Sequence, residues 1–271
     1  MDGIRLEVAR RALRDRRRAR AWWLFGVGLY TLAIVAAFPA MEGQTEINRI
    51  LEEYPPELLA LFAGGQTTFD LASAGDYLNS QLFAFIVPML LVILGVGFAA
   101  GTLAGEEERG TLDLVLTYPV SRVSVVLQKA LVLIVEVALL TLVVHLVAFG
   151  VGRVFEIELP LADVVAAGLA QLLLGVVFGF LTLAAAAASG SRGLSIGVGA
   201  GTAAGTYLVG SLAPVVSWLE PVKWVSPFFY ATGGNPLVNG LPAWRIILLA
   251  GSAAVLAVVA VVAFQRRDVR G

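Results

Sequence analysis

Six apolar stretches, each long enough to cross a lipid bilayer, constrain this chain more than any other feature of its sequence. A helix of about 20 apolar residues spans the hydrocarbon core, and a helix satisfies its own backbone hydrogen bonds there. We therefore predict an all-α, polytopic membrane protein with six transmembrane helices. The predicted spans are Ala21–Ala40, Leu82–Ala104, Val123–Val151, Leu161–Ala188, Leu194–Val216 and Trp244–Phe264.

The composition agrees with a chain that lies in lipid. Mean hydropathy is +0.85 and only 14% of residues are charged, whereas soluble domains have about 25%. Six spans leave too few residues for a catalytic domain. We expect one transmembrane domain over 1–271, with an interfacial helix at 1–20, the bundle at 21–264 and a tail at 265–271.

The residue types exclude several kinds of function. The chain has no cysteine, so it has no disulfide framework and no thiolate metal site, and we expect no metal or cofactor on it. One histidine and no carboxylate cluster among the spans argue against an intramembrane enzyme, which needs a nucleophile and a base within reach. A net charge of −1 suggests no nucleic-acid partner.

The distribution of Lys and Arg predicts the orientation of the chain, because cytoplasmic loops are richer in these residues. Fifteen of the 19 lie before the first span, after the last one, in the second and fourth connections, or, as Lys129, at the start of the third span. Both termini are therefore predicted to be cytoplasmic. The eight arginines before the first span alternate with an apolar stripe, which is typical of a helix on the inner leaflet. A cluster that only enforces topology remains a compatible alternative.

Glycines at spacing four share one face of a helix and let another helix approach closely. Three spans contain such sets, and we expect at least two of them to pack within the bundle. The longest set is also a candidate for a subunit interface. The sets are Gly97 with Gly101, Gly175 with Gly179, and Gly193, Gly197, Gly201 and Gly205.

Two ionisable residues, Glu136 and His145, lie inside the third span. Such groups are costly in lipid unless paired or hydrated, so both are candidates for a substrate pathway. Nine residues turn a helix by about 180°, so the two face opposite sides. Glu136 either lines a pathway or pairs with a polar group of a neighbouring span. His145 is either a ligand or a packed polar side chain.

A short charged segment separates the second and third spans. Glu106, Glu107 and Glu108 follow Gly105, where negative charge favours a helix start. Arg109 and Asp113 are spaced to pair, and Leu112, Val115 and Leu116 form an apolar ridge. Pro119 ends the helix, and Ser121 or Ser124 is placed to cap the third span. We predict a short helix with its charges facing the cytoplasm.

This segment resembles the signature of type-2 ABC exporter permeases, in which an acidic stretch precedes Gly-Thr-Leu-Glu, a leucine-rich turn, Pro-Val-Ser-Arg and Gly-Lys. Here Asp113 stands for the usual Glu, and Gln128 replaces the Gly before Lys129. The basic N-terminal helix, the six spans and the late segments Trp224–Tyr230 and Gly234–Leu237 extend the resemblance over nearly the whole chain.

The resemblance implies that residues 106–117 form a coupling helix that docks in a groove of an ATPase subunit. The residues expected to couple are Glu106, Glu107, Glu108, Arg109, Gly110, Thr111, Leu112, Asp113 and Leu116. Two ATPase subunits, carrying ATP and Mg²⁺, and a second permease subunit, identical or different, are the implied partners. The location implied is the cytoplasmic membrane of a prokaryote.

No phosphate-binding Gly-x-x-x-x-Gly-Lys-Ser/Thr motif occurs in this chain, so we expect ATP hydrolysis on a partner. The alternative function is a channel or secondary transporter that works without an ATPase and uses Glu136. The apolar spans favour an amphipathic or lipid-soluble cargo.

Two further segments lie between spans, and short helices are predicted in the first of them. Residues 47–54 and 56–62 lie in the first long connection, as a lid or a packed cap. Residues 217–240 combine aromatic residues with prolines and glycines; they are expected to form interfacial anchors and, by the family resemblance, a re-entrant hairpin.

Overall fold

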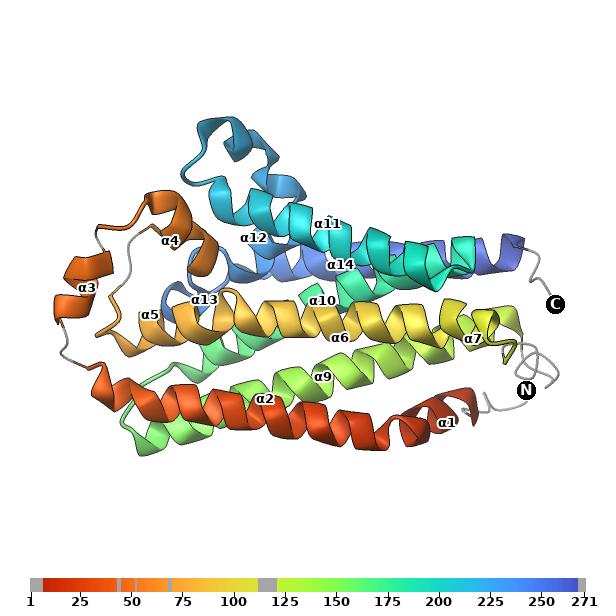
Figure 1. Ribbon diagram of the computed structural model, residues 1–271, viewed down its shortest axis with the longest axis horizontal. Coiled ribbons are helices and arrows are strands. Elements are labelled where there is room, and N and C mark those ends of the chain that lie inside the picture. Colours follow the sequence, from red (N-terminus) through yellow and green to blue (C-terminus); the bar gives the residue numbers. More distant parts are fainter. Residues whose placement is uncertain (1–6, 43–44, 52, 68–69, 112–120, 268–271) are drawn as a thin grey trace.

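The computed structural model describes residues 7–42, 45–51, 53–67, 70–111 and 121–267, and the regular structure of these residues is helical. Six long helices run along the long axis of the molecule (Figure 1). They are α2 (Arg17–Ala37), α6 (Ile86–Thr102), α9 (Arg122–Val154), α10 (Leu161–Ser189), α11 (Arg192–Leu212) and α14 (Ala243–Arg266).

Shorter helices gather at the two ends of this bundle (Figure 1). One end carries α1 (Glu7–Asp15), α7 (Ala104–Glu108) and the end of α14. The opposite end carries η1 (Phe38–Ala40), α3 (Thr45–Leu51), α4 (Pro56–Phe62), α5 (Ala74–Leu78), η2 (Asn79–Phe83), η3 (Ser217–Val225), α12 (Pro227–Thr232) and α13 (Pro236–Asn239). Short helices were predicted in the first of the two loop regions only: the predicted bounds of α4 are confirmed, whereas α3 begins two residues before the predicted residue 47 and ends at Leu51.

Within the part of the chain that the structure describes, five helical stretches are long and apolar enough to cross a membrane, which confirms a polytopic all-α protein. They are Arg17–Ala40, Ala74–Glu108, Arg122–Val154, Leu161–Ser189 and Ala243–Arg266. The remaining predicted span corresponds to α11, which has 21 residues. It is not among the five, because its many glycines and hydroxyl side chains make it less apolar than the others.

The second apolar stretch begins at Ala74, earlier than the predicted Leu82. Hydropathy did not predict that the stretch begins at Ala74, because polar residues precede Leu82. Two of them are buried: the Tyr77 hydroxyl donates to the Ile34 carbonyl at 3.1 Å, and Asn79 bonds to Gln66 at 3.2 Å. A single π-helical turn, η2, lies between α5 and α6. In this turn the Ala84 N–H donates to the Asn79 carbonyl.

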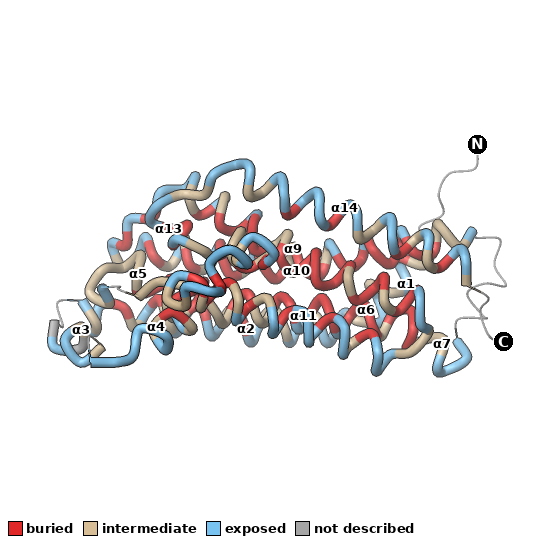
Figure 2. Tube along the Cα trace, turned by 90° about the horizontal axis from the view of Figure 1, so that it is seen from above, coloured by how far each residue is buried: buried red, intermediate tan, exposed pale blue. Residues whose placement is uncertain are grey.

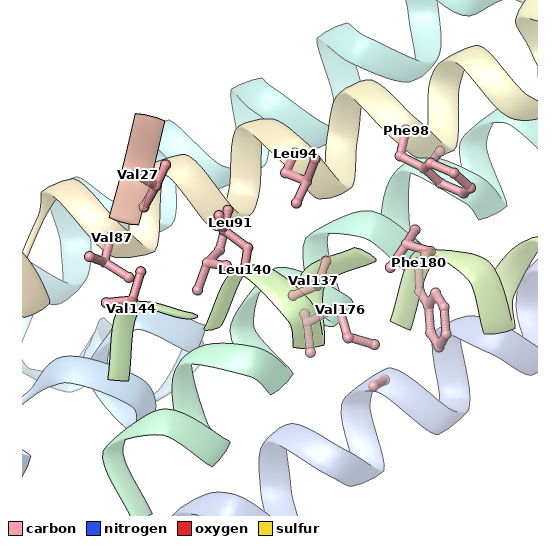
Figure 3. Close-up of a cluster of buried hydrophobic side chains, with 14 of the residues drawn as sticks. Val27, Val87, Leu91, Leu94, Phe98, Val137, Leu140, Val144, Val176 and Phe180 are labelled. Carbon is pink, nitrogen blue, oxygen red and sulfur yellow. The ribbon is translucent and has the colours of Figure 1, made fainter. Parts of the chain in front are cut away.

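Helix α10 is the centre of the bundle and packs against α6, α9, α11 and α14. Apolar side chains from α2, α6, α9 and α10 form one continuous core, part of which is drawn in Figure 3. Buried residues run along the middle of the molecule, while the outer side of α14 is exposed along much of its length (Figure 2). The exposed side is apolar, as expected of a surface that faces lipid.

Glycine allows the central helices to approach closely. A Cβ at Gly175 would lie 2.8 Å from Val137, and one at Gly179 would lie 2.7 Å from Leu133. This set packs within the bundle, as predicted. The expectation that a second set does so is wrong, because Gly97 and Gly101 have open space at the Cβ position. Helix α6 instead turns Gly95, two residues away, toward α10.

Candidate coupling site

The predicted coupling segment begins in α7, at the end of the bundle that also holds α1 and the end of α14 (Figure 1). The chain bends at Leu103, where φ is −117° and ψ is −69°, and α7 follows directly. Gly110 ends this turn with a φ of 66°. The three acidic residues of α7 thus project among the helix ends that surround it.

Glu106 forms an ion pair with Lys129 of α9, with 2.6 Å between Oε2 and Nζ. The Lys129 side chain is 1% exposed, and its ammonium also donates to the Thr102 carbonyl. A buried ammonium without a carboxylate is strongly unfavourable. The charge of Lys129 therefore fixes α7 against α9.

Glu107 forms an ion pair with Arg267, the residue that follows α14. Both side chains are mostly buried, at 13% and 17% exposed. The same guanidinium donates to the Ala186 carbonyl near the end of α10 at 3.2 Å, and the Arg267 carbonyl accepts from Arg122 at 2.6 Å. This contact joins α7 to the ends of α10 and α14 and to the start of α9.

Glu108 contacts the start of α11. Its Oε1 accepts from the Arg192 backbone N–H at 2.8 Å, and a carboxylate at this position complements the positive end of the helix dipole. Glu106, Glu107 and Glu108, with Lys129, Arg267 and the Arg192 amide, are called the acidic clasp below. Through these contacts one short helix is fastened to the ends of α9, α10, α11 and α14.

The predicted coupling residues divide into three groups. Glu106 and Glu107 are half-buried and point into the bundle, a role that sequence reasoning missed. Arg109, Gly110 and Thr111 are exposed, as is Glu108. Leu112, Asp113 and Leu116 lie outside the described residues. The predicted cap of the third span is confirmed: the Ser121 hydroxyl accepts from the Ser124 N–H at 3.2 Å.

Glu136, a pathway candidate, pairs with Arg20 of α2 at 2.9 Å and is 4% exposed. The Arg20 guanidinium also donates to the Leu13 carbonyl of α1 at 3.2 Å. Helix α1 packs on α9, where the Ala9 N–H donates to Gln128 Oε1 at 3.1 Å. Gln128, the departure from the family pattern, therefore helps to hold the basic N-terminal helix.

His145 faces a different neighbourhood from Glu136, as their spacing predicted. Its ring lies 5.1 Å from that of Phe83 and packs over Gly168 of α10. Nδ1 is 2.8 Å from the Thr141 carbonyl, and Nε2 is buried without a hydrogen-bond partner. Within the described part of the chain, no group of three His, Asp or Glu side chains is arranged to hold a metal ion.

The long glycine stripe of α11 lies on the outside of the molecule. Gly193, Gly197, Gly201 and Gly205 are exposed and have open space at the Cβ position. A second stripe of small residues, two positions later, faces inward: Ser195, Gly199 and Ala203 are buried. A Cβ at Gly199 would lie 2.0 Å from the Thr182 hydroxyl, so α11 packs on α10 through this second stripe.

A bundle of long apolar helices with an acidic clasp at one end defines a multi-pass membrane protein, and the sequence match narrows the class further. A family model described as ABC-2 family transporter protein matches residues 6–269, and this chain belongs to that family. The resemblance drawn from the charged segment is thereby confirmed. The chain is the membrane permease component of an ABC transporter. A comparison with curated proteins found no match.

Proposed function

We propose that this chain is the transmembrane subunit of an ATP-driven exporter, which forms the substrate pathway and is driven by a separate ATPase. Family membership and the lack of a phosphate-binding loop support this division of roles. ATP and Mg²⁺ bind to the partner. The acidic clasp is the observation that carries the proposal, because a coupling segment must be joined to the helices that it moves.

The clasp suggests how force from the ATPase reaches the membrane. Docking of an ATPase on the exposed residues around Glu108–Thr111 displaces α7. Because Glu106, Glu107 and Glu108 contact different helices, that displacement passes to α9, α10, α11 and α14 together. The packed helices then move as rigid bodies between two arrangements, one open to each side of the membrane, which is the basis of alternating access.

The arrangement of the helices supports six spans and the predicted orientation. The start of α1 and the end of α14 lie at the same end of the bundle (Figure 1). An even number of crossings is needed to bring them there, and α11 supplies the sixth beside the five apolar stretches. The clasp end, which is rich in arginine, faces the cytoplasm of a prokaryote in this proposal.

The exposed glycine stripe of α11 supports assembly with a second permease subunit. A helix with an exposed row of glycines that have open space at the Cβ position is suited to close contact with another helix. Two permease subunits and two ATPase subunits form the transporter. The glycine stripe of α11 is suited to contact with an identical or a different permease subunit, so it fits both a homodimer and a heterodimer.

The Arg20–Glu136 ion pair bears on the alternative, an ATPase-independent channel or secondary transporter using Glu136. The carboxylate is already compensated by a cation of the neighbouring helix. This contact favours a structural role for Glu136 over an ion site, and we retain the ATP-driven exporter.

The test is co-purification of the chain with a phosphate-loop ATPase encoded beside it, followed by ATP hydrolysis in proteoliposomes with a panel of amphipathic compounds. We expect a stable complex whose hydrolysis rate responds to a transported compound. A permease that transports without any ATPase would overturn the proposal.

The clasp is tested in the same complex by charge reversal. Glu107→Arg should keep the ATPase bound, because Glu107 points into the bundle. It should reduce compound-stimulated hydrolysis at least tenfold, because the new guanidinium would face that of Arg267. A loss of about 1.4 kcal/mol of coupling free energy corresponds to such a tenfold reduction. The swap Glu107→Arg with Arg267→Glu should restore the response. Unchanged stimulation in the single variant would assign the clasp to folding alone.

A further inference from the structure

Four aromatic rings form a cluster at the end of the bundle opposite the clasp. Trp224 of η3, Phe229 and Tyr230 of α12, and Trp244 of α14 lie with ring centroids between 5.1 and 6.4 Å apart. Trp224 is 51% exposed and Trp244 is 44% exposed. Aromatic residues with this exposure are typical of the level where lipid headgroups meet the apolar core. This group is called the aromatic platform.

Two cations lie on the aromatic platform. Lys223 Nζ is 5.2 Å from the Trp224 ring, and the Arg245 guanidinium is 4.9 Å from the Phe229 ring. Lys223 also approaches Phe229, at 5.6 Å, so the two positive charges share one ring.

The two cations differ in how well they are compensated. Lys223 pairs with Glu220 at 3.4 Å, whereas Arg245 forms no ion pair with any described residue. Among the described residues, the Arg245 side chain makes one hydrogen bond, to the Gly233 carbonyl at 2.7 Å, and its Nε has no partner. Helix α14 begins beside it without a side-chain cap, and a helix start also favours negative charge. The local charge is thus positive and incompletely balanced.

A shallow apolar groove, open to the outside and lined by residues of α14 alone, follows Arg245 along the helix. Leu248, Ser252 and Val255 follow Arg245 by three, seven and ten residues, so this side of the groove shares a helix face with Arg245. Gly251 opens the groove, because nothing occupies the space where its Cβ would be. The lining residues are Ile247, Leu248, Gly251, Ser252, Val255 and Leu256.

We propose that Arg245, Lys223 and the groove of α14 bind one anionic phospholipid of the leaflet opposite the clasp. The phosphate-bearing headgroup lies at Arg245, with Lys223 beside it, and an acyl chain lies in the groove. The two parts follow one another along α14, as headgroup and chain do in a lipid. The positive charge at the headgroup level selects an anionic lipid over a zwitterionic one.

The experiment uses the tryptophans of the site as reporters. Trp22 and Trp23 are replaced with Phe, which leaves Trp218, Trp224 and Trp244, all near the platform end. The full-length chain is reconstituted in phosphatidylcholine bilayers that contain a small fraction of lipid with brominated acyl chains, which quench nearby tryptophan. We expect brominated phosphatidylglycerol to quench more strongly than brominated phosphatidylcholine at the same mole fraction.

Variants at two positions test the charge of Arg245 and the shape of the groove separately. Arg245→Gln should reduce the preference for phosphatidylglycerol about fivefold, which is the weight of one basic residue at an anionic surface, whereas Arg245→Lys should keep it. Gly251→Leu should reduce quenching by brominated phosphatidylglycerol, because the new side chain fills the groove without meeting other protein atoms.

Matched controls exist on α9. Arg153 also lies over an aromatic ring, 4.9 Å from Phe149, and Gly150 is also open at its Cβ position. Arg153→Gln and Gly150→Leu should leave the lipid preference unchanged. Equal quenching by the two brominated lipids, or a preference that survives Arg245→Gln, would overturn the proposal. Absence of quenching by either lipid would also overturn it.

Discussion

At the scale of single residues, three largely buried ion pairs join helices that lie far apart in the sequence. Lys129 and Glu136 lie seven residues apart on α9, and each is compensated by a different neighbour. The sequence identified Glu136 as unusual but could not identify Arg20 as its partner, because the packing of α2 against α9, and not a local spacing, brings the two side chains together. The same is true of Glu107 and Arg267, which are 160 residues apart.

Glu106→Gln should destabilise the protein by about 3 kcal/mol, because it leaves the buried Lys129 ammonium without a carboxylate. Thermal unfolding in detergent measures the loss. Adding Lys129→Met should recover most of it, since both partners are then uncharged. Glu158→Gln, at an exposed position, is the control and should have no effect. A single variant as stable as the unmodified protein would contradict a structural role for this pair.

Arg20→Gln and Glu136→Gln should each lower stability, and the double variant should cost no more than the worse single one. This non-additivity is expected of two residues that form one ion pair. A double-mutant cycle on unfolding temperature checks it. If the two effects simply add, Arg20 and Glu136 act independently, and Glu136 becomes a pathway candidate again.

At the scale of helices, the sequence predicted where most of the long helices lie, but it did not predict which face of each helix packs against the others. Apolar length located the spans because lipid requires it, and the Ser121 cap followed from local chemistry. Helix α11 shows why faces are harder to predict. It carries two stripes of small residues on opposite sides, and the longer one is exposed. Composition alone does not show which stripe another helix of the same chain will meet.

The two stripes give a direct comparison on one helix. Gly199→Ala should cost about 2 kcal/mol, because the added methyl group overlaps the buried Thr182 side chain. Gly201→Ala, on the exposed stripe, should leave the stability of the monomer unchanged. Unfolding temperatures in a detergent that separates subunits compare the two. Equal destabilisation would mean that the inner and outer faces have been assigned the wrong way round.

At the scale of the whole molecule, α6–α7 and α9 form a frame that connects one membrane face to the other. The start of α1 and the end of α14 lie with the clasp, and the aromatic platform lies at the opposite end (Figure 1). This arrangement depends on α11 crossing the bilayer, a point that composition leaves undecided because the helix is rich in glycine.

The chain has no cysteine, so single cysteines report the topology directly. Cysteines at Ser189 and Ser217, which flank α11 at exposed positions, should react with a membrane-impermeant maleimide from opposite sides of the membrane. Ser189 should be labelled only in inverted vesicles. Labelling of both from the same side would show that α11 does not cross, and would reduce the number of spans to five.

The contact between Glu107 and Arg267 has a consequence for how the protein is made. Arg267 follows Glu107 by 160 residues, so translation supplies it much later. Glu107 is inserted long before and waits for its counter-charge until the final helix has entered the membrane. A product truncated before Arg267 therefore lacks this contact, and α7 is joined to the end of α14 only after that last helix has been synthesised.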